Sequence, residues 1–378
     1  MKILVVSDNY PSLKKPARGV FVYNLIQQFA RLGHTVHIIA PEGLLARNYT
    51  NEKKDYGKEL GTVYRPKFLN ASAKSIFGFN TYRIGELGQI KAVKRVVKRH
   101  KIEFDVVYAH FLANAFIAVE ALSEYNKPVY AAIGEYNNLE VRKAYYSKAY
   151  FSSILDKISG YIAVSPQIKD RLVNYGVDEN KIMIKPNAVN STVFYPRNKQ
   201  EMRSKYKLPK DKFLIVFVGR FIENKGPKVL LKATENLEGL GLIFVGSGQQ
   251  VLEGNHIVFK DSVSSKEVPE LLSAADLFVL PTWHEGSCNA IVEAMACGLP
   301  IISSDIPEIR FQCDPSFSIL VDPLDVKAIE SAIDSIVSNQ EKSAQMAKNA
   351  LDYSKNFEIG ERALSILNFI KGEVVSSK

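Results

Sequence analysis

Long hydrophobic runs are absent from this chain of 378 residues. No apolar stretch approaches the roughly 20 residues that a membrane-spanning helix needs. The apolar run at the amino terminus is too short for a signal sequence, so we interpret residues 3–6 as a first buried strand. Cysteine is also scarce, because only Cys288, Cys297 and Cys313 occur, without the spacing of a metal site. An odd, small number of cysteines favours a reducing, cytoplasmic location.

Acidic residues are far fewer than basic residues in the first half of the chain. Residues 1–187 carry 28 Lys and Arg against 16 Asp and Glu, whereas the remainder carries 21 against 24. This basic half suggests an anionic lipid surface or a phosphorylated acceptor as partner, with nucleic acid as the competing interpretation. A helix is predicted at 86–100. The densest basic run, 91–101, falls largely within it, has apolar residues interleaved at helical spacing and is typical of the solvated face of an amphipathic helix. Because aromatic residues do not interleave it, we do not expect nucleic acid as a partner.

Short apolar runs alternate with helical patterns along both halves of the chain. Strands are predicted at 3–6, 36–40, 106–109, 129–133, 161–164 and 181–184, and again at 213–218, 242–245, 257–259, 277–280, 300–303 and 318–321. This alternation predicts parallel sheets covered by helices on both faces, and therefore two Rossmann-like, doubly wound α/β domains. The polar stretch 187–211 is interpreted as the linker, and Ser165 as the cap of a helix at 166–174.

The stretch 277–300 indicates a ligand site. A buried strand is predicted at 277–280, and a short polar loop then leads into a helix that begins near Asn289. The free N–H groups at the start of that helix favour an anion, and Gly286 allows the backbone to come close to a ligand. Glu285 in the loop and Glu293 in the second helical turn are suited to accept hydrogen bonds from hydroxyls of a ribose and a sugar. The stretch therefore predicts a cradle for a nucleotide sugar.

A second motif follows the predicted strand at 213–218. Arg220 offers a fork of donors to a phosphate, Lys225 offers a compact charge, and Gly226 opens the next helix. Fixed cations can stabilise the charge that builds on a leaving diphosphate without a metal. The chain contains no Asp-x-Asp pattern, which argues against a mechanism that uses a divalent metal. Gly246 and Gly248 form a Gly-x-Gly turn that a tight strand-to-helix connection would explain equally well.

These motifs resemble those of the retaining glycosyltransferases of family 4, also called group 1 glycosyltransferases. Glu285 and Glu293 match the family's E-x7-E motif, and residues 219–226 match its Gly-Arg-x4-Lys-Gly motif. The resemblance implies the GT-B fold, in which two Rossmann-like domains face a central cleft. Residues 1–187 would then bind the acceptor and residues 188–357 the nucleotide sugar. The last helix, within 358–378, would cross back to the N-terminal domain.

The resemblance also implies roles for single residues. His110, at the end of the strand 106–109, would contact the donor sugar near the reacting carbon, and Gly19 would approach the phosphate or the acceptor. Glu135 is a candidate for the acceptor side, and residues 259–263 stand where the family meets the nucleobase. The remaining donor-binding residues implied by the resemblance are Gly246, Gly248, Gly286, Ser287, Cys288, Asn289 and Glu293.

The sequence therefore predicts a retaining, metal-independent glycosyltransferase without a cofactor. It would move a hexose or hexosamine from a nucleoside diphosphate, expected to be UDP, to a hydroxyl of a glycan or lipid-linked acceptor. We expect His110, Arg220, Lys225 and Glu285 to carry the chemistry, in the cytoplasm or at the inner face of the membrane, in the synthesis of a surface polysaccharide or glycolipid. Two alternatives stay open: a GT-B epimerase of nucleotide sugars, and a non-catalytic module that binds a nucleotide sugar.

Overall fold

The computed structural model describes the chain except for Lys14, Ala17 and residues 45–59, 70–74, 77–78, 135–145 and 373–378. The described chain forms two compact units: Met1–Lys185 together with Gly360–Lys378, and Pro186–Ile359. The sequence places this boundary at 187/188 and the start of the returning tail at 358. Glu135 lies outside the described residues, so its predicted role stays a prediction.

The first unit is built on a seven-stranded sheet in the order β11-β10-β9-β8-β1-β2-β4, in which every pair is parallel. Its strands are β1 Lys2–Val6, β2 Thr35–Ile39, β4 Gly61–Tyr64, β8 Val106–His110, β9 Val129–Ile133, β10 Gly160–Ala163 and β11 Ile182–Ile184. Its helices are α1 Val20–Arg31, α2 Thr81–His100, α3 Leu112–Leu122, α5 Lys148–Lys157, α6 Pro166–Asn174 and α14 Ile359–Lys371. Short strands lie beside it: β3 Glu42–Gly43 pairs with β5 Lys67–Phe68, and β6 Ser75–Ile76 pairs with β7 Phe79–Asn80.

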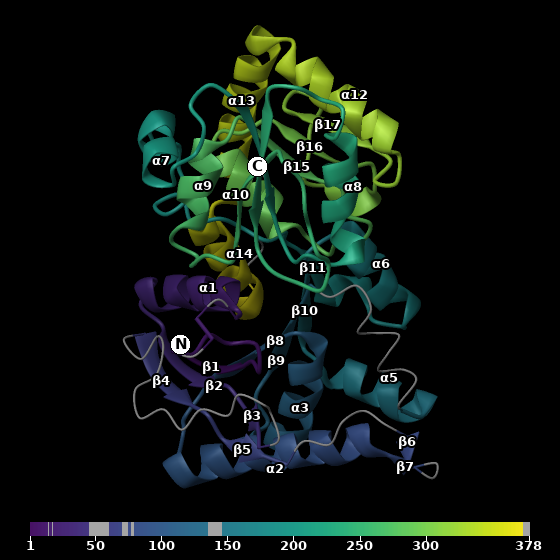
Figure 1. Ribbon diagram of the computed structural model, residues 1–378. Coiled ribbons are helices and arrows are strands. Elements are labelled where there is room, and N and C mark those ends of the chain that lie inside the picture. Colours follow the sequence, from purple (N-terminus) through teal and green to yellow (C-terminus); the bar gives the residue numbers. More distant parts are fainter. Residues whose placement is uncertain are drawn as a thin grey trace. The chain divides into compact units, whose positions relative to one another are not determined.

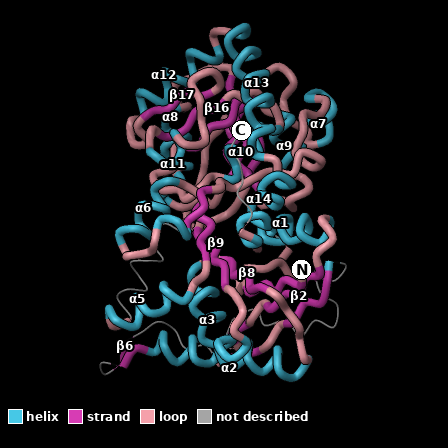
Figure 2. The backbone as a smooth tube through the Cα atoms, turned by 180° about the vertical axis from the view of Figure 1, so that it is seen from behind, coloured by secondary structure: helices cyan, strands magenta, loops and turns pink. Residues whose placement is uncertain are grey.

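Helices cover both faces of this sheet, as Figures 1 and 2 show. Along β8, Val107 and Ala109 pack into the core that α2, α3, α5 and α6 cover, whereas Tyr108 packs into the core that α1 and α14 cover. Strand side chains alternate between faces, so an uninterrupted apolar strand needs a hydrophobic layer on each side. The last helix therefore completes the core of the first unit, through Ala363, Ile366 and Leu367.

The second unit is built on a six-stranded parallel sheet in the order β14-β13-β12-β15-β16-β17. Its strands are β12 Phe213–Val218, β13 Leu240–Val245, β14 Ile257–Asp261, β15 Leu277–Leu280, β16 Ile301–Ser304 and β17 Ser318–Val321. Its helices are α7 Lys199–Lys205, α8 Pro227–Ala233, α9 Val268–Ala274, α10 Asn289–Ala296, α11 Pro307–Arg310, α12 Val326–Val337 and α13 Gln340–Ser354. One core joins its strands and helices. The prediction of an α/β fold with two Rossmann-like units is thus confirmed.

Three local predictions are wrong. The segment 187–211 is not a plain linker, because Asn198 accepts hydrogen bonds from the backbone N–H groups of Gln200 and Glu201 and so caps α7. Ser165 does not cap α6 with its side chain, since its hydroxyl has no hydrogen-bond partner. Helix α2 begins at Thr81, five residues before the predicted 86.

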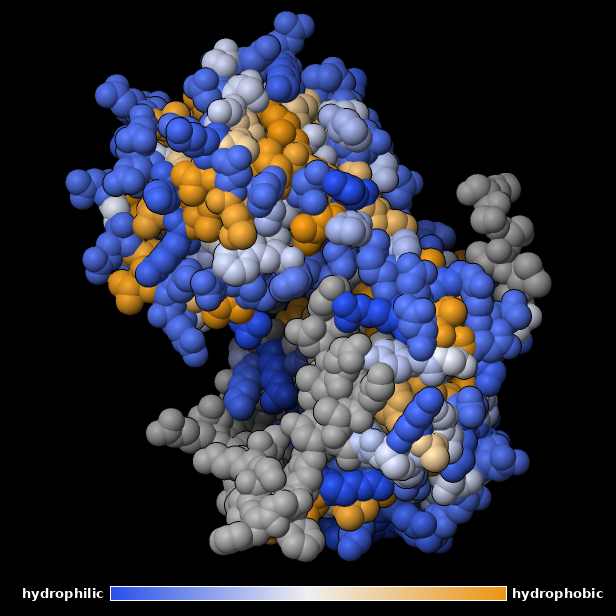
Figure 3. All heavy atoms as spheres, turned by 90° about the vertical axis from the view of Figure 1, so that its right-hand side faces the viewer, coloured by the Kyte–Doolittle hydropathy of each residue, from blue (hydrophilic) through white to orange (hydrophobic). Residues whose placement is uncertain are grey.

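Hydrophilic side chains cover most of the face drawn in Figure 3, with smaller separate hydrophobic areas between them. Within the described residues, no helix combines the length and the apolar character that crossing a membrane requires.

Candidate functional site

Two loops of the second unit leave neighbouring strands at the same edge of the sheet. The loop 219–226 follows β12 and the loop 281–288 follows β15, and these two strands pair in parallel. The carboxyl ends of parallel strands meet at one sheet edge, where open α/β sheets usually bind ligands. Asn224 joins the two loops, because its carbonyl accepts hydrogen bonds from Trp283 N at 2.9 Å and Thr282 Oγ1 at 3.1 Å.

Gly226 brings the two loops into contact. Its φ is +66°, a left-handed conformation that glycine adopts without strain, and it directly precedes α8. A Cβ at this position would lie 2.2 Å from the carbonyl oxygen of Pro281. The glycine is therefore required by the packing of one loop on the other, and not only by a ligand.

The predicted phosphate-binding and sugar-binding residues are brought together by this packing. Lys225 Nζ forms an ion pair with Glu285 Oε1, and the two side chains are 20% and 11% exposed. A pair with so little exposure is screened less by solvent than a surface pair. Arg220 is exposed, and among the described residues its guanidinium has no hydrogen-bond or ion-pair partner. Within the described part of the chain, this edge thus presents the unpaired cation of Arg220 and the half-buried ion pair of Lys225 with Glu285.

Glu293 lies in the second turn of α10, as predicted. It keeps part of its surface open to solvent, yet burial raises the pKa of its carboxyl to about 8. A carboxyl that is hard to ionise lacks enough donors to stabilise its charge. Hydroxyl groups of a ligand would supply such donors.

At the start of α10, protein groups already form hydrogen bonds with polar atoms that the sequence predicts to be open to a ligand. Cys288, the N-cap residue, is buried, and its backbone N–H already donates to Gln312 Oε1 at 2.6 Å. Ser287 is 8% exposed, and its hydroxyl accepts a hydrogen bond from Asn187 N at 3.0 Å. These two predicted donor-binding residues therefore hold the loop in place. Gly286 lies between them and Glu285 and is half-buried.

Gly246 and Gly248 lie beside the loop that carries Arg220, but no helix follows them. A Cβ at Gly246 would lie 1.9 Å from the oxygen of Gly219, and one at Gly248 would lie 2.3 Å from the oxygen of Phe221. Phe221 N donates to Ser247 O at 2.9 Å. The two glycines are thus needed where backbone meets backbone, and the alternative explanation of the pattern, a tight strand-to-helix turn, does not apply because β14 follows β13.

Three buried polar atoms in or beside these loops have no hydrogen-bond partner among the described residues: Trp283 Nε1, Asn289 Oδ1 and Gln250 Oε1. Buried polar groups are normally paired, so each one calls for a missing partner such as water or a ligand. Sequence analysis identified Asn289 but missed the other two. The position of Trp283, the only tryptophan of the chain, directly before His284 and Glu285 was the available signal.

The predicted residues of the first unit lie at the corresponding edge of its own sheet. His110 ends β8 and is 6% exposed, with the rings of Phe111 and Phe21 at 4.6 and 5.3 Å between centroids. Gly19 precedes α1 with φ +65°, and a Cβ there would lie 2.1 Å from the oxygen of Asn9. Gly19 is thus required by the loop after β1.

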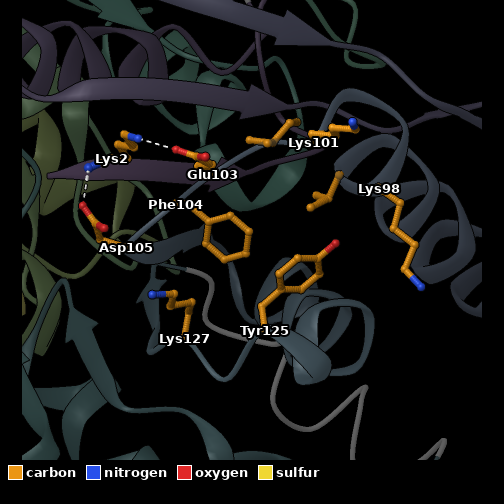
Figure 4. Close-up of a pocket in the computed structure, with 10 residues that line it drawn as sticks. Lys2, Lys98, Lys101, Glu103, Phe104, Asp105, Tyr125 and Lys127 are labelled. Carbon is orange, nitrogen blue, oxygen red and sulfur yellow. Dashed lines mark hydrogen bonds and ion pairs between the residues drawn. The ribbon is translucent and has the colours of Figure 1, made fainter.

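A pocket of about 630 Å³ lies at the opposite edge of that sheet, where β1 and β8 begin. Figure 4 shows Lys98, Lys101 and Lys127 around it, with the rings of Phe104 and Tyr125 between them. It contains none of the predicted site residues. Among the described residues, no group of three or more His, Cys, Asp or Glu side chains could hold a metal ion.

Both units match models of known protein families. Residues 198–352 match the model of the glycosyl transferases group 1, and residues 19–193 match the model of glycosyltransferase family 4. The two matches follow each other: the match over 19–193 covers most of the first unit and the start of the second, and the match over 198–352 lies within the second unit. The chain belongs to the group 1 glycosyltransferases, which have the GT-B fold, and it is therefore an enzyme that transfers a sugar.

Individual relatives cover almost the whole chain. A teichuronic acid biosynthesis glycosyltransferase of Bacillus subtilis, TuaC, is 27% identical over 97% of both chains. The GPI3 subunit of a yeast phosphatidylinositol N-acetylglucosaminyltransferase is 25% identical over 88% of this chain and 73% of its own. Sucrose-phosphate synthase from Thermosynechococcus elongatus has a similar fold, with a TM-score of 0.79, 18% identity and 98% of each chain covered. Anabaena HepE in complex with UDP and glucose aligns with a TM-score of 0.74 and 18% identity, over 98% of this chain and 99% of its own.

Proposed function

We propose that the protein is a retaining glycosyltransferase that moves a hexose or hexosamine from UDP to a hydroxyl of a growing surface polysaccharide or glycolipid. The observation that carries the proposal is the joined pair of loops in the second unit. They place Lys225 against Glu285, and Arg220 has no partner among the residues that the structure describes. Relatives support the substrate class, because HepE is described in complex with UDP and glucose and TuaC is assigned to teichuronic acid biosynthesis.

Each residue has a part in the proposed transfer. The bond between the sugar's anomeric carbon and the diphosphate breaks, and its electron pair stays on the phosphate oxygen. Arg220 and Lys225 stabilise that negative charge, so no metal ion is required. Glu285 accepts hydrogen bonds from the sugar hydroxyls, and Glu293 accepts them from the ribose.

The acceptor hydroxyl attacks the anomeric carbon from the face that the diphosphate leaves. Its proton passes to the departing phosphate oxygen, so the anomeric configuration is retained without a protein nucleophile. His110 is proposed to contact the sugar near the reacting carbon.

Product analysis tests this proposal. The purified enzyme is incubated with UDP-sugars and lipid-linked or oligosaccharide acceptors in the presence of EDTA, and the new linkage is read by NMR. We expect a product with retained configuration and undiminished rate in EDTA. Formation of an isomeric UDP-sugar without acceptor would identify an epimerase. UDP-sugar binding without turnover would identify a binding module, and an inverted product would refute retention.

We also propose that the enzyme works in the cytoplasm at an anionic membrane surface. The support is the basic face of α2, where Lys91, Arg95 and Arg99 accompany Lys94 and Lys98, both paired with Glu124 at 3.2 Å. Sedimentation with vesicles tests this part alone. Binding that does not rise when phosphatidylglycerol replaces phosphatidylcholine would refute it.

A further inference from the structure

The last helix carries a buried cation that the proposed reaction does not use. Arg362 is 4% exposed, and burial lowers the pKa of its guanidinium to about 10. Its Nη1 donates to the carbonyl oxygen of Lys185 at 2.7 Å. None of the carboxylates in the described part of the chain forms an ion pair with it. Burying a cation without a counter-ion is costly, so the surrounding structure must hold it in place.

Helix α14 holds Arg362 at the sheet edge where the strands end. Near the carboxyl end of the helix, Tyr130 donates its hydroxyl to Ile370 O at 3.1 Å, and Tyr130 stands early in β9. Near the amino end, Arg362 reaches Lys185, which directly follows β11. The strands are parallel, so the helix runs from their carboxyl ends back toward their amino ends. Arg362 therefore lies at the edge that also carries His110, the last residue of β8.

Tyr108 lies on the same face of the sheet, two residues before His110. Its hydroxyl is 3.5 Å from His110 Nδ1, and the phenol is fully buried. Burial raises the pKa of Tyr108 to about 12, so the hydroxyl keeps its proton and can donate it. Ala363, the residue that follows Arg362 in α14, packs in the same core as Tyr108. The charge of Arg362 lowers the pKa of both Tyr108 and His110, although burial has the larger effect on each.

His110 remains a neutral imidazole in this environment. Burial, and secondly the charge of Arg362, lower its pKa to about 3. The titratable or charged side chains that act on it are Tyr108 from β8 and Arg362 from α14. Asn114 of α3 donates to His110 O at 2.6 Å and to Asp8 Oδ1 at 2.9 Å, so the carboxylate of Asp8 is engaged by an amide. A neutral imidazole has one donor nitrogen and one acceptor nitrogen, and the hydrogen bond at one decides the role of the other.

We propose that Arg362 is a positioning residue that fixes the tautomer of His110 through Tyr108. The charge of Arg362, on the helix that packs against this face of the sheet, attracts the lone pairs of the phenol oxygen and turns the O–H bond away from α14, toward His110 Nδ1. Nδ1 then accepts, and the ring proton sits on Nε2. Nε2–H becomes a donor for a sugar hydroxyl or for the departing diphosphate. This catalytic consequence rests on the proposed function, whereas the tautomer itself does not.

The tautomer can be measured by NMR on the full-length enzyme with ¹⁵N-labelled histidine, using His110→Gln for assignment. We expect the wild-type ring to carry its proton on Nε2. Arg362→Met and Tyr108→Phe should each give a mixture of tautomers, whereas Arg362→Lys, which keeps the charge, should largely retain the wild-type pattern. Lys371→Met, which removes a cation from the last turn of the same helix, is the matched control and should change nothing at His110.

Steady-state kinetics distinguish a positioning role of Arg362 from a merely structural one. Arg362→Met should lower kcat about 10-fold and leave the KM for the donor within about twofold, with recovery in Arg362→Lys. If Arg362→Met fails to fold, Tyr108→Phe decides. An unchanged tautomer in Tyr108→Phe, or in a folded Arg362→Met, overturns the inference. If the wild type transfers no sugar but the tautomer responds as described, the proposed function fails and the role of Arg362 stands.

Discussion

Each of the two units has its own parallel sheet with helices on both faces, but charged side chains are arranged differently in the two units. In the second unit the candidate residues sit in two loops that follow neighbouring strands, and Lys225 meets Glu285 in a half-buried pair. In the first unit His110 is buried and neutral, and the cation that acts on it, Arg362, comes from the far end of the chain. The second unit is arranged to receive a charged ligand, whereas the first is arranged to hold one side chain in a defined protonation state.

The largest effect is expected from Lys225→Ala. It removes the cation next to Glu285, so kcat should fall about 10²- to 10³-fold, the range seen when one group that stabilises a developing anion is lost. Steady-state kinetics with a UDP-sugar measures this. Lys228→Ala, an exposed lysine of α8, is the control. Equal rates for Lys225→Ala and wild type would contradict the view that the second unit is arranged to receive a charged ligand.

Gly226→Ala should show how much the contact between the two loops of the second unit contributes to stability. The new Cβ would meet Pro281 O at 2.2 Å in a left-handed conformation, so we expect a loss of about 2–4 kcal/mol in the free energy of unfolding. Gly33→Ala is matched, because Gly33 has φ +82° and nothing within 4 Å of its Cβ position, and it should cost about 1 kcal/mol. Urea denaturation measures both. A cost for Gly226→Ala no larger than that for Gly33→Ala would show that the two loops are not in contact.

Glu293→Gln should change how stability depends on pH. The folded pKa of about 8 lies above the ordinary value of 4.5, so the folded state binds this proton more tightly. The resulting stabilisation is complete below about pH 4.5 and is lost as the pH rises through 8. Wild type should therefore lose about 4 kcal/mol relative to Glu293→Gln between pH 5 and pH 9. Parallel denaturation curves at all pH values would mean that Glu293 is not buried, and Glu341→Gln, which is exposed, serves as the control.

The smallest effect on donor binding is expected at the basic pocket of the first unit. Lys101→Glu with Lys127→Glu should change the affinity for a UDP-sugar less than twofold, because this pocket is at the opposite sheet edge from His110. Calorimetric titration measures this, with Lys327→Glu and Lys348→Glu in the second unit as the control pair. A tenfold loss of affinity confined to the Lys101 and Lys127 variant would show that the donor binds to the first unit, which contradicts the proposal.

The sequence predicts the second unit's features well because its signals are local. A strand, a loop and a helix follow one another within 277–300, so periodicity and turn residues locate Glu285 and Glu293 in the right elements. It predicts the first unit's features poorly, because the neighbours of His110 depend on tertiary packing. Nothing near Arg362 in sequence shows that it is buried and donates to the carbonyl oxygen of Lys185. The hydrogen bonds of Ser287 and Cys288 could not be predicted for a similar reason, since their partners, Asn187 and Gln312, are distant in sequence.

The central claim is that the second unit binds the diphosphate of a nucleotide sugar between Lys225, Arg220 and the start of α10. A crystal structure of the full chain with a bound UDP-sugar tests it most directly. We expect phosphate oxygens within hydrogen-bond distance of Lys225 and Arg220, and the ribose hydroxyls on Glu293. A diphosphate bound elsewhere, with the Lys225–Glu285 pair undisturbed and Arg220 directed into solvent, would contradict it.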